Sequence, residues 1–127
     1  MTALSDMRDL VAAKLGSVKN LSVYELTPWL DPDQGETVSV GVMLDVTDSG
    51  GYNSTLKYAT LTLAVVAVTV PAGNALRQAA YDGLHEQGGS QGDITVVDLT
   101  HVSESGGVDE DLVYRMSIIF DVIFSGG

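Results

Sequence analysis

The chain has 127 residues, a length typical of one domain and sufficient to bury a hydrophobic core. Hydrophobic residues make up 45% of it and charged residues only 18%, a balance that excludes intrinsic disorder. Seventeen acidic residues against six scattered basic ones give a formal net charge of −11, which argues against binding to nucleic acid through a basic patch. Because the sequence has no cysteine, disulfides, thiolate metal sites and cysteine nucleophiles are excluded.

The N-terminal part predicts a helix, a strand and a loop. Ala3 to Gly16 has apolar side chains at every third or fourth position and a glycine where a helix C-cap belongs, which predicts an amphipathic helix. Leu21 to Leu26 alternates weakly between apolar and polar residues and is interpreted as a strand. The next segment, Thr27 to Glu36, contains two prolines, one glycine and three acidic residues, which predict a loop.

The middle of the chain predicts two strands joined by an exposed connection. Thr37 to Asp45 has apolar residues at every second position, and Val46 to Thr55 is rich in residues that favour turns. Leu56 to Val70 is then a very long strand, dense in β-branched residues from Leu61 onward, which predicts that both of its faces are covered there. A transmembrane helix is excluded because the apolar run before Pro71 has twelve residues, whereas a span needs about 20.

The C-terminal half predicts a second helix and two more strands. Pro71 is expected to end the preceding strand, and the helix has a narrow face of small residues that would let it lie close to a sheet. In chain order the elements are a helix over Asn74–Gln87, a turn over Gly88–Asp93, a strand over Ile94–Ser103, an acidic loop over Glu104–Asp111 and a strand over Leu112–Phe124.

This order of elements predicts an α+β fold in a single domain over residues 1–127. The expected architecture is a mostly antiparallel sheet of about five strands with two helices packed on one face. Strands of about thirteen residues would reach roughly 43 Å at about 3.3 Å per residue. We therefore expect long strands, or a hairpin, to extend from the core and to need a neighbouring subunit.

No pattern in the sequence predicts catalysis, so no catalytic, cofactor-binding or metal-ligating residue is assigned. The letters G-x-S-x-G at residues 88–92 follow a helix and precede a strand, the reverse of a nucleophile elbow. His85 and His101 lack the close spacing of metal ligands, and His85 is expected to complement the dipole at the helix C-terminus. The acidic run from Asp31 to Glu36 resembles the start of a calcium loop but lacks its final glutamate, which leaves weak divalent-ion binding or a solvated loop.

Five residues are candidates for a subunit or partner interface: Trp29, Tyr52, Asp109, Glu110 and Asp111. Trp29, the only tryptophan, either folds back over a sheet edge or anchors an interface, where tryptophan is enriched. Tyr52 presents the same alternatives in its glycine-rich connection. The three consecutive acidic residues suit either a solvated loop or the basic patch of a partner.

The chain as a whole resembles the tail terminator proteins of long-tailed bacteriophages. The resemblance rests on a first helix ending in KLG, the acidic proline-rich loop, the unit LKYATLTLAVVAVTVPAGNALRQAAYDGL and the final strand YRMSIIFDVIF, and it covers nearly all 127 residues. It implies a structural virion protein without enzymatic activity or cofactor. Such a protein forms a homohexameric ring that caps the tail tube, ends tail elongation and joins the tail to the head connector.

The resemblance also implies partners and a location. The partners would be other copies of the chain, the tail tube protein and the head-completion protein, with no membrane involved. The protein would be made in the host cytoplasm and lie in the virion tail at the head-tail junction. DNA would pass through the lumen without specific binding, which the acidic composition favours. A weak dependence of assembly on Mg²⁺ would follow if acidic loops of neighbouring subunits repel each other.

Two alternatives remain open at the level of sequence. The first is another neck protein of the head-tail junction or a tail tube subunit, which would polymerise without limit instead of closing into a ring. The second is a small-ligand-binding or enzymatic domain with a pocket between helices and sheet, for which convergent charged residues are missing.

Overall fold

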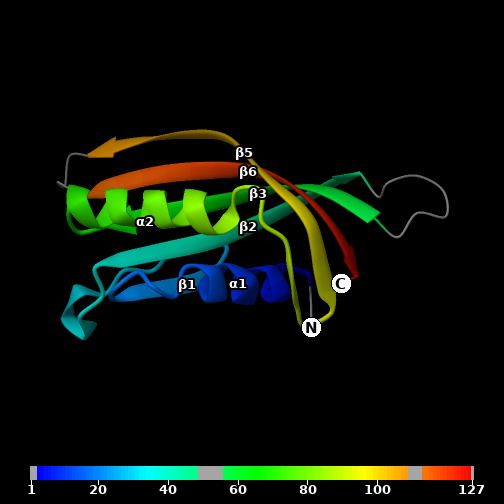
Figure 1. Ribbon diagram of the computed structural model, residues 1–127. Coiled ribbons are helices and arrows are strands. Elements are labelled where there is room, and N and C mark those ends of the chain that lie inside the picture. The colour runs from blue at the N-terminus through cyan, green and yellow to red at the C-terminus, as the bar shows by residue number, and fades with distance from the viewer. Residues whose placement is uncertain (1–2, 49–55, 109–112, 127) are drawn as a thin grey trace.

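The computed structural model describes residues 3–48, 56–108 and 113–126. Its elements follow one another along the chain as shown in Figure 1. They are helix α1 (Ala3–Lys14), strand β1 (Leu21–Glu25), the short 3₁₀ helix η1 (Pro32–Gln34), strands β2 (Val38–Asp48) and β3 (Leu56–Ala67), helix α2 (Val70–Leu84), and strands β4 (Gly89–Gln91), β5 (Ile94–Val108) and β6 (Tyr114–Gly126).

The strands form one six-stranded sheet in the order β1-β2-β3-β6-β5-β4. Strand β1 runs parallel to β2, whereas the other neighbouring pairs are antiparallel. Both α-helices pack on the same face of the sheet (Figure 1). The predicted α+β class and the position of the helices are therefore confirmed, while the sheet is mixed and has six strands instead of about five.

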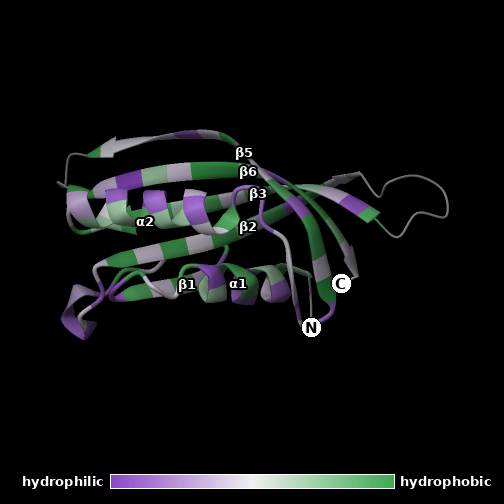
Figure 2. Cartoon of the chain, in the orientation of Figure 1, coloured by the Kyte–Doolittle hydropathy of each residue, from purple (hydrophilic) through white to green (hydrophobic). Residues whose placement is uncertain are grey.

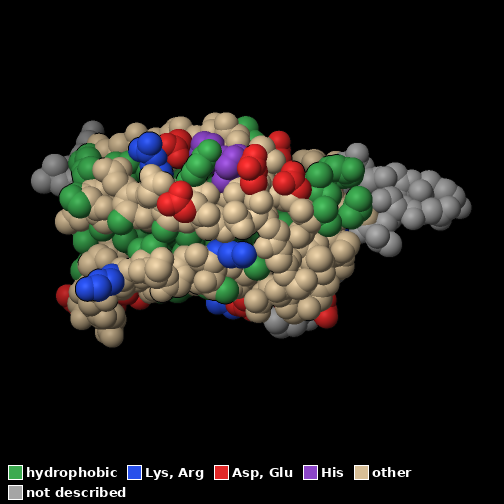
Figure 3. All heavy atoms as spheres, viewed as in Figure 1, with side chains coloured by type: hydrophobic (Ala, Val, Ile, Leu, Met, Phe, Trp, Pro, Cys, Tyr) green, Lys and Arg blue, Asp and Glu red, His purple; other side chains and the backbone are tan. Residues whose placement is uncertain are grey.

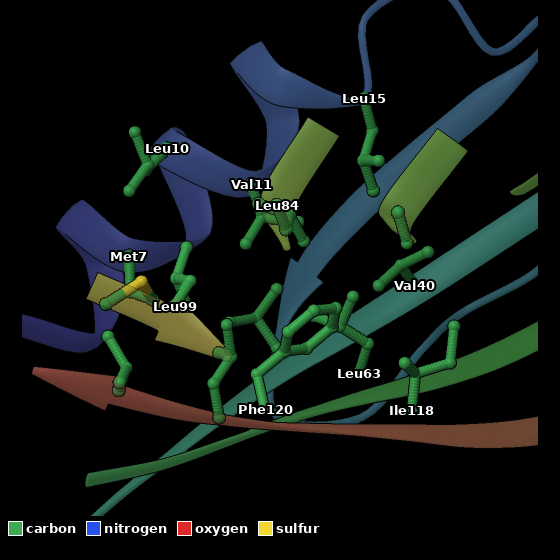
Figure 4. Close-up of a cluster of buried hydrophobic side chains, with 14 of the residues drawn as sticks. Met7, Leu10, Val11, Leu15, Val40, Leu63, Leu84, Leu99, Ile118 and Phe120 are labelled. Atoms are coloured by element: carbon green, nitrogen blue, oxygen red, sulfur yellow. The ribbon is translucent and has the colours of Figure 1, made fainter. Parts of the chain in front are cut away.

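The core lies between the helices and the sheet face that they cover. Apolar and polar residues alternate along the central strands (Figure 2), and the apolar set points to the helices because successive side chains of a strand face opposite sides. Side chains of α1, α2 and the strands meet around Phe120 and Leu63 (Figure 4). The larger strand residues buried in this core are Val38, Val40 and Val42 of β2, Leu61, Leu63 and Val65 of β3, Ile94, Val96 and Leu99 of β5, and Met116, Ile118, Phe120, Val122 and Phe124 of β6.

The sheet curls around the helices, so that α1 contacts β1 and β2 on one side and β4 and β5 on the other. Strand β5 carries register shifts between Val96 and Asp98 and between His101 and Ser103, and bulges of this kind bend a strand. The curl brings the buried carboxylate of Asp6 in α1 to the turn before β5, where its Oδ2 accepts the Asp93 N–H at 3.0 Å. This hydrogen bond between Asp6 and Asp93 holds α1 against the strand end of the curled sheet.

Several predicted boundaries are wrong. The long strand ends at Ala67 instead of Val70, because Thr69 is the N-cap of α2 and its Oγ1 accepts the Ala72 N–H at 3.2 Å. Pro71 therefore occupies the first turn of the helix, where its missing N–H costs nothing. Burial on both faces of β3 is confined to Val65–Ala67.

The helix and loop predictions also need correction. Helix α2 ends at Leu84, and part of the predicted turn after it is strand β4. Strands β2 and β5 continue through residues predicted to be loop, as far as Asp48 and Val108. Pairing with β3 and β6 supplies backbone hydrogen bonds there and overrides the turn preference of Ser, Gly and Asp.

We expect Phe120→Ala to lower the free energy of unfolding by about 3–5 kcal/mol, because the change leaves a cavity where a fully buried ring was. Urea unfolding followed by far-ultraviolet circular dichroism measures the loss. Val97→Ala, at a side chain that is 58% exposed, is the control and should cost less than about 1 kcal/mol. Equal losses in the two variants would contradict this description of the core.

Candidate subunit interface

Trp29 lies in the segment between β1 and η1, and its side chain is 69% exposed. Leu26 in the same segment is 55% exposed. The Trp29 side chain is therefore not buried, although it lines a hollow together with Val66 of β3. Exposed tryptophan is enriched at contact sites for other proteins. Both alternatives for Trp29, cover of a sheet edge and anchor of an interface, stay predictions.

The segment is held against the sheet face opposite the helices. The Leu26 N–H donates to the Val42 carbonyl at 2.8 Å. Gly41 points away from the helices, since its neighbours Val40 and Val42 face the core, and a Cβ at this position would collide with the Leu26 carbonyl and the Pro28 ring. Only glycine lets the segment approach β2 so closely.

Glu36 fixes the other end of the segment. Its Oε1 accepts the hydroxyl of Ser22 at 2.7 Å and that of Tyr24 at 3.4 Å, while its Oε2 accepts the Asp31 N–H at 2.9 Å. The hydrogen bond from Ser22, and next the one from the Asp31 backbone, lower the pKa of Glu36 below its ordinary value because they favour the ionised form. The carboxylate thereby joins β1 to the loop that carries Trp29.

The acidic run is used within its own loop. Asp31 is the N-cap of η1, where its Oδ1 accepts the Asp33 N–H at 3.1 Å, and Gly35 ends the turn with a φ of 81°. Two of the three carboxylates that resemble a calcium loop, Asp31 and Glu36, thus hold backbone N–H groups. Within the described ranges, no group of three His, Cys, Asp or Glu side chains could hold a metal ion.

Beside Trp29 the open sheet face is hollowed. A depression of about 330 Å³ is lined by Pro28, Trp29, Leu30 and Pro32 of the segment and by Val66, Val68, Val113 and Arg115. We call residues 26–33 the Trp29 segment. It presents a rigid apolar surface on the face of the sheet that the helices leave uncovered.

A second hollow lies on the helix side of the sheet, between α2, the turn that follows α1 and the start of β2. It has a volume of about 370 Å³, and Figure 3 shows hydrophobic side chains along it with Lys or Arg side chains at its border. We call it the α1–α2 groove; its lining residues are Ser17, Val18, Lys19, Thr37, Val38, Ala72, Ala75 and Ala79. The groove was missed from the sequence, where the small residues of α2 predicted only close packing on a sheet.

The small residues of α2 allow close packing at some positions and leave the groove open at others. Gly73 packs against the Tyr114 ring and Gly83 against the Lys14 carbonyl, so that there is little or no room for a side chain at either position. Ala75 and Ala79, in contrast, border the groove. A signal was present in the sequence, because alanines one turn apart on the side of a helix leave room for another chain.

The two histidines come together at the end of α2. The backbone N–H of His101 donates to Nδ1 of His85 at 3.0 Å, and Tyr81 stacks on the His85 ring with centroids 4.6 Å apart. The His85 side chain is thus used to hold the end of α2 against β5, and its role as a cation at the helix C-terminus stays a prediction. Glu104 links His101 at 3.4 Å to Arg77 of α2, and the cluster fastens α2 to β5.

Tyr52, Asp109, Glu110 and Asp111 lie outside the described residues, so the structure places only Trp29 among the candidate interface residues.

Comparisons with known proteins identify the fold. No protein-family model and no curated protein matches the chain. Among solved structures, it is similar to a chain in the virion of a native gene transfer agent particle, with a TM-score of 0.62 and 20% sequence identity over 92% of this chain and 84% of that chain. No helix in the described ranges is long and apolar enough to cross a membrane. At this identity the likeness shows a shared fold.

We expect Glu36→Gln to destabilise the protein at neutral pH and to have a smaller effect in acid. Because the folded-state pKa of Glu36 is lowered, its contribution is complete above the unfolded-state value of about 4.3 and is lost as the pH falls through the folded-state value. Urea unfolding at a series of pH values measures the difference from the wild type, and Trp29 fluorescence follows the loop.

Glu25→Gln is the matched control for this experiment, since Glu25 is exposed at the end of β1. The difference in free energy of unfolding between wild type and Glu25→Gln should be small and should not decrease as the pH is lowered. A difference between wild type and Glu36→Gln that stays constant from pH 7 to about pH 3 would contradict a stabilising role for the ionised carboxylate.

Proposed function

We propose that this protein is a structural subunit of a phage-like virion, and that it forms the ring which ends the tail tube and joins it to the head. The observation that carries the proposal is the shared fold: 92% of the chain superposes on a chain of a gene transfer agent virion. The two proteins are only 20% identical, so the likeness lies in the architecture. The similar chain is part of a virion, which favours an assembly function over catalysis.

The surfaces of the subunit support a ring. The Trp29 segment and the α1–α2 groove lie on opposite faces of the sheet, and a contact between two different surfaces repeats head to tail and closes into a ring when the rotation allows. A single surface that contacts its own copy would instead favour a two-fold pair. A net charge of −11 suits a lumen that DNA traverses, because like charges do not retain the phosphate backbone.

A second structural role has support from the same likeness. The similar chain belongs to a whole virion, and the likeness singles out no part of that particle, so a neck protein or a tail tube subunit fits as well as a terminator. A terminator and a tube subunit differ in how assembly ends. A terminator forms a closed ring with a fixed number of subunits, whereas tube subunits continue to add in successive layers.

We expect light scattering after size exclusion to find one species of about 80 kDa, six times the 13.3 kDa subunit, over a wide range of protein concentration. A mass that increases without limit as the protein concentration rises would favour a tail tube subunit over a terminator. A monomer under every condition would contradict the ring.

Mg²⁺ should increase the assembled fraction modestly, by offsetting repulsion between the acidic surfaces of neighbours. The control is NaCl at equal ionic strength, which separates general screening from an effect of the divalent ion. An assembled fraction that falls on addition of Mg²⁺ would contradict electrostatic repulsion as the opposing force.

A further inference from the structure

The α1–α2 groove has the form of a docking site for a large apolar side chain. Its floor is formed by Val18, Val38 and three alanines of α2, and it is open to solvent along its length. A continuation of about 480 Å³ follows α2 past Ala75 and Ala79 to Gly83 and Lys14. The small residues of α2 leave space where longer side chains would close the surface.

The charges around the groove differ from those of the rest of the molecule. Lys19 lines it and Lys14 lines its continuation, and neither lysine forms an ion pair within the described part of the chain. The carboxylate that lines the continuation, Asp82, accepts a hydrogen bond from the Gln78 amide at 3.0 Å. In a chain with a net charge of −11, the groove itself is an apolar surface whose lining includes Lys19 and no carboxylate.

The Trp29 segment has the complementary chemistry. Its apolar residues are followed at once by Asp31 and Asp33, so that an aromatic anchor and two carboxylates share one short loop. The loop is fixed by Gly41 beneath it and by the hydrogen bonds of Glu36. A pre-organised tryptophan loses little conformational entropy on binding, which is the property of an interface hot spot.

We propose that the Trp29 segment of one subunit docks in the α1–α2 groove of the next copy of the same chain. The indole lies on the alanine floor, and Asp33, with Asp31 beside it, faces Lys19 at the border. The inference rests on the proposed function, in which the subunits form a ring, and it identifies the contact between neighbouring subunits of that ring. The occupant is a second copy because this chain itself supplies both halves of a match in shape and charge.

A subunit cannot make this contact with itself. Trp29 lines a hollow with Val66 on the open face of the sheet, whereas the groove contains Val38 on the helix face. The sheet separates the two surfaces, so the contact has to be made between subunits. Repeated head to tail, it leaves each subunit with one donor loop and one acceptor groove engaged.

The test uses two variants that each remove one half of the contact. Trp29→Ala deletes the anchor, and Ala75→Glu fills the groove and repels the acidic loop, while Ala75 is exposed enough for the fold to accept the change. Each variant alone should assemble at least about 30-fold more weakly than the wild type. Ala13→Glu makes the same substitution at an exposed alanine of α1 outside the groove and should still form rings.

The mixture of the two variants gives the decisive result. The Ala75→Glu subunit still has Trp29, and the Trp29→Ala subunit still has an open groove, so an equimolar mixture should form a discrete dimer of about 27 kDa, twice the 13.3 kDa subunit. Growth stops there because neither free end can bind again. Circular dichroism of each variant confirms that loss of assembly is not loss of folding.

The outcomes separate this inference from the proposed function. Rings formed by both variants as readily as by the wild type would overturn the contact and leave the ring standing. A wild type that is monomeric would overturn the ring, and disulfide trapping would then decide the contact, since the chain has no cysteine of its own. A mixture of Asp33→Cys and Lys19→Cys should cross-link on oxidation faster than Asp33→Cys with Ala13→Cys; equal rates would overturn the proposal.

Discussion

The apolar face shared by β2, β3, β6 and β5 has to be removed from water, and both helices are used in covering it. Each valine or leucine buried there contributes on the order of 1.5–3 kcal/mol, so this interface dominates the stability of the subunit. The curl of the sheet brings β4 and β5 against α1 and completes the cover. Nothing comparable is left for the opposite face, where, among the described residues, the Trp29 segment covers only one end.

This asymmetry leaves the Trp29 segment exposed on the face that the helices do not cover. A close approach at Gly41 and a single carboxylate, Glu36, hold the Trp29 segment in place, and neither depends on burying the indole. The side chain of Trp29 itself stays 69% exposed. A large exposed aromatic side chain lowers solubility unless a partner covers it, which is the reason that the proposed contact uses Trp29.

The elements could be predicted from the sequence where periodicity was strong and local. The alternation in residues 114–124 specifies strand β6, and the spacing of Leu4, Met7 and Val11 specifies helix α1. The predictions failed where a distant strand or a cap decided the outcome, as at Pro71, whose place in a helix depends on the Thr69 cap, and at Gly89–Gln91, which is a strand only because it pairs with β5. The exposure of Trp29 was left open, since it depends on which face of β2 the loop crosses.

The α1–α2 groove was missed from the sequence, because the turn after α1, the start of β2 and one side of α2 meet there only in the folded chain. Nothing in the sequence distinguishes the lysines at this groove from the other basic residues. They are notable because the chain as a whole has a net charge of −11. Subunits with that charge repel one another at long range, and screening at physiological salt confines the repulsion to about 8 Å. The proposed contact between an acidic loop and a lysine-bordered groove would then act only at short range and in one orientation. A contact of that kind favours ordered closure over indiscriminate association, as the proposed ring requires.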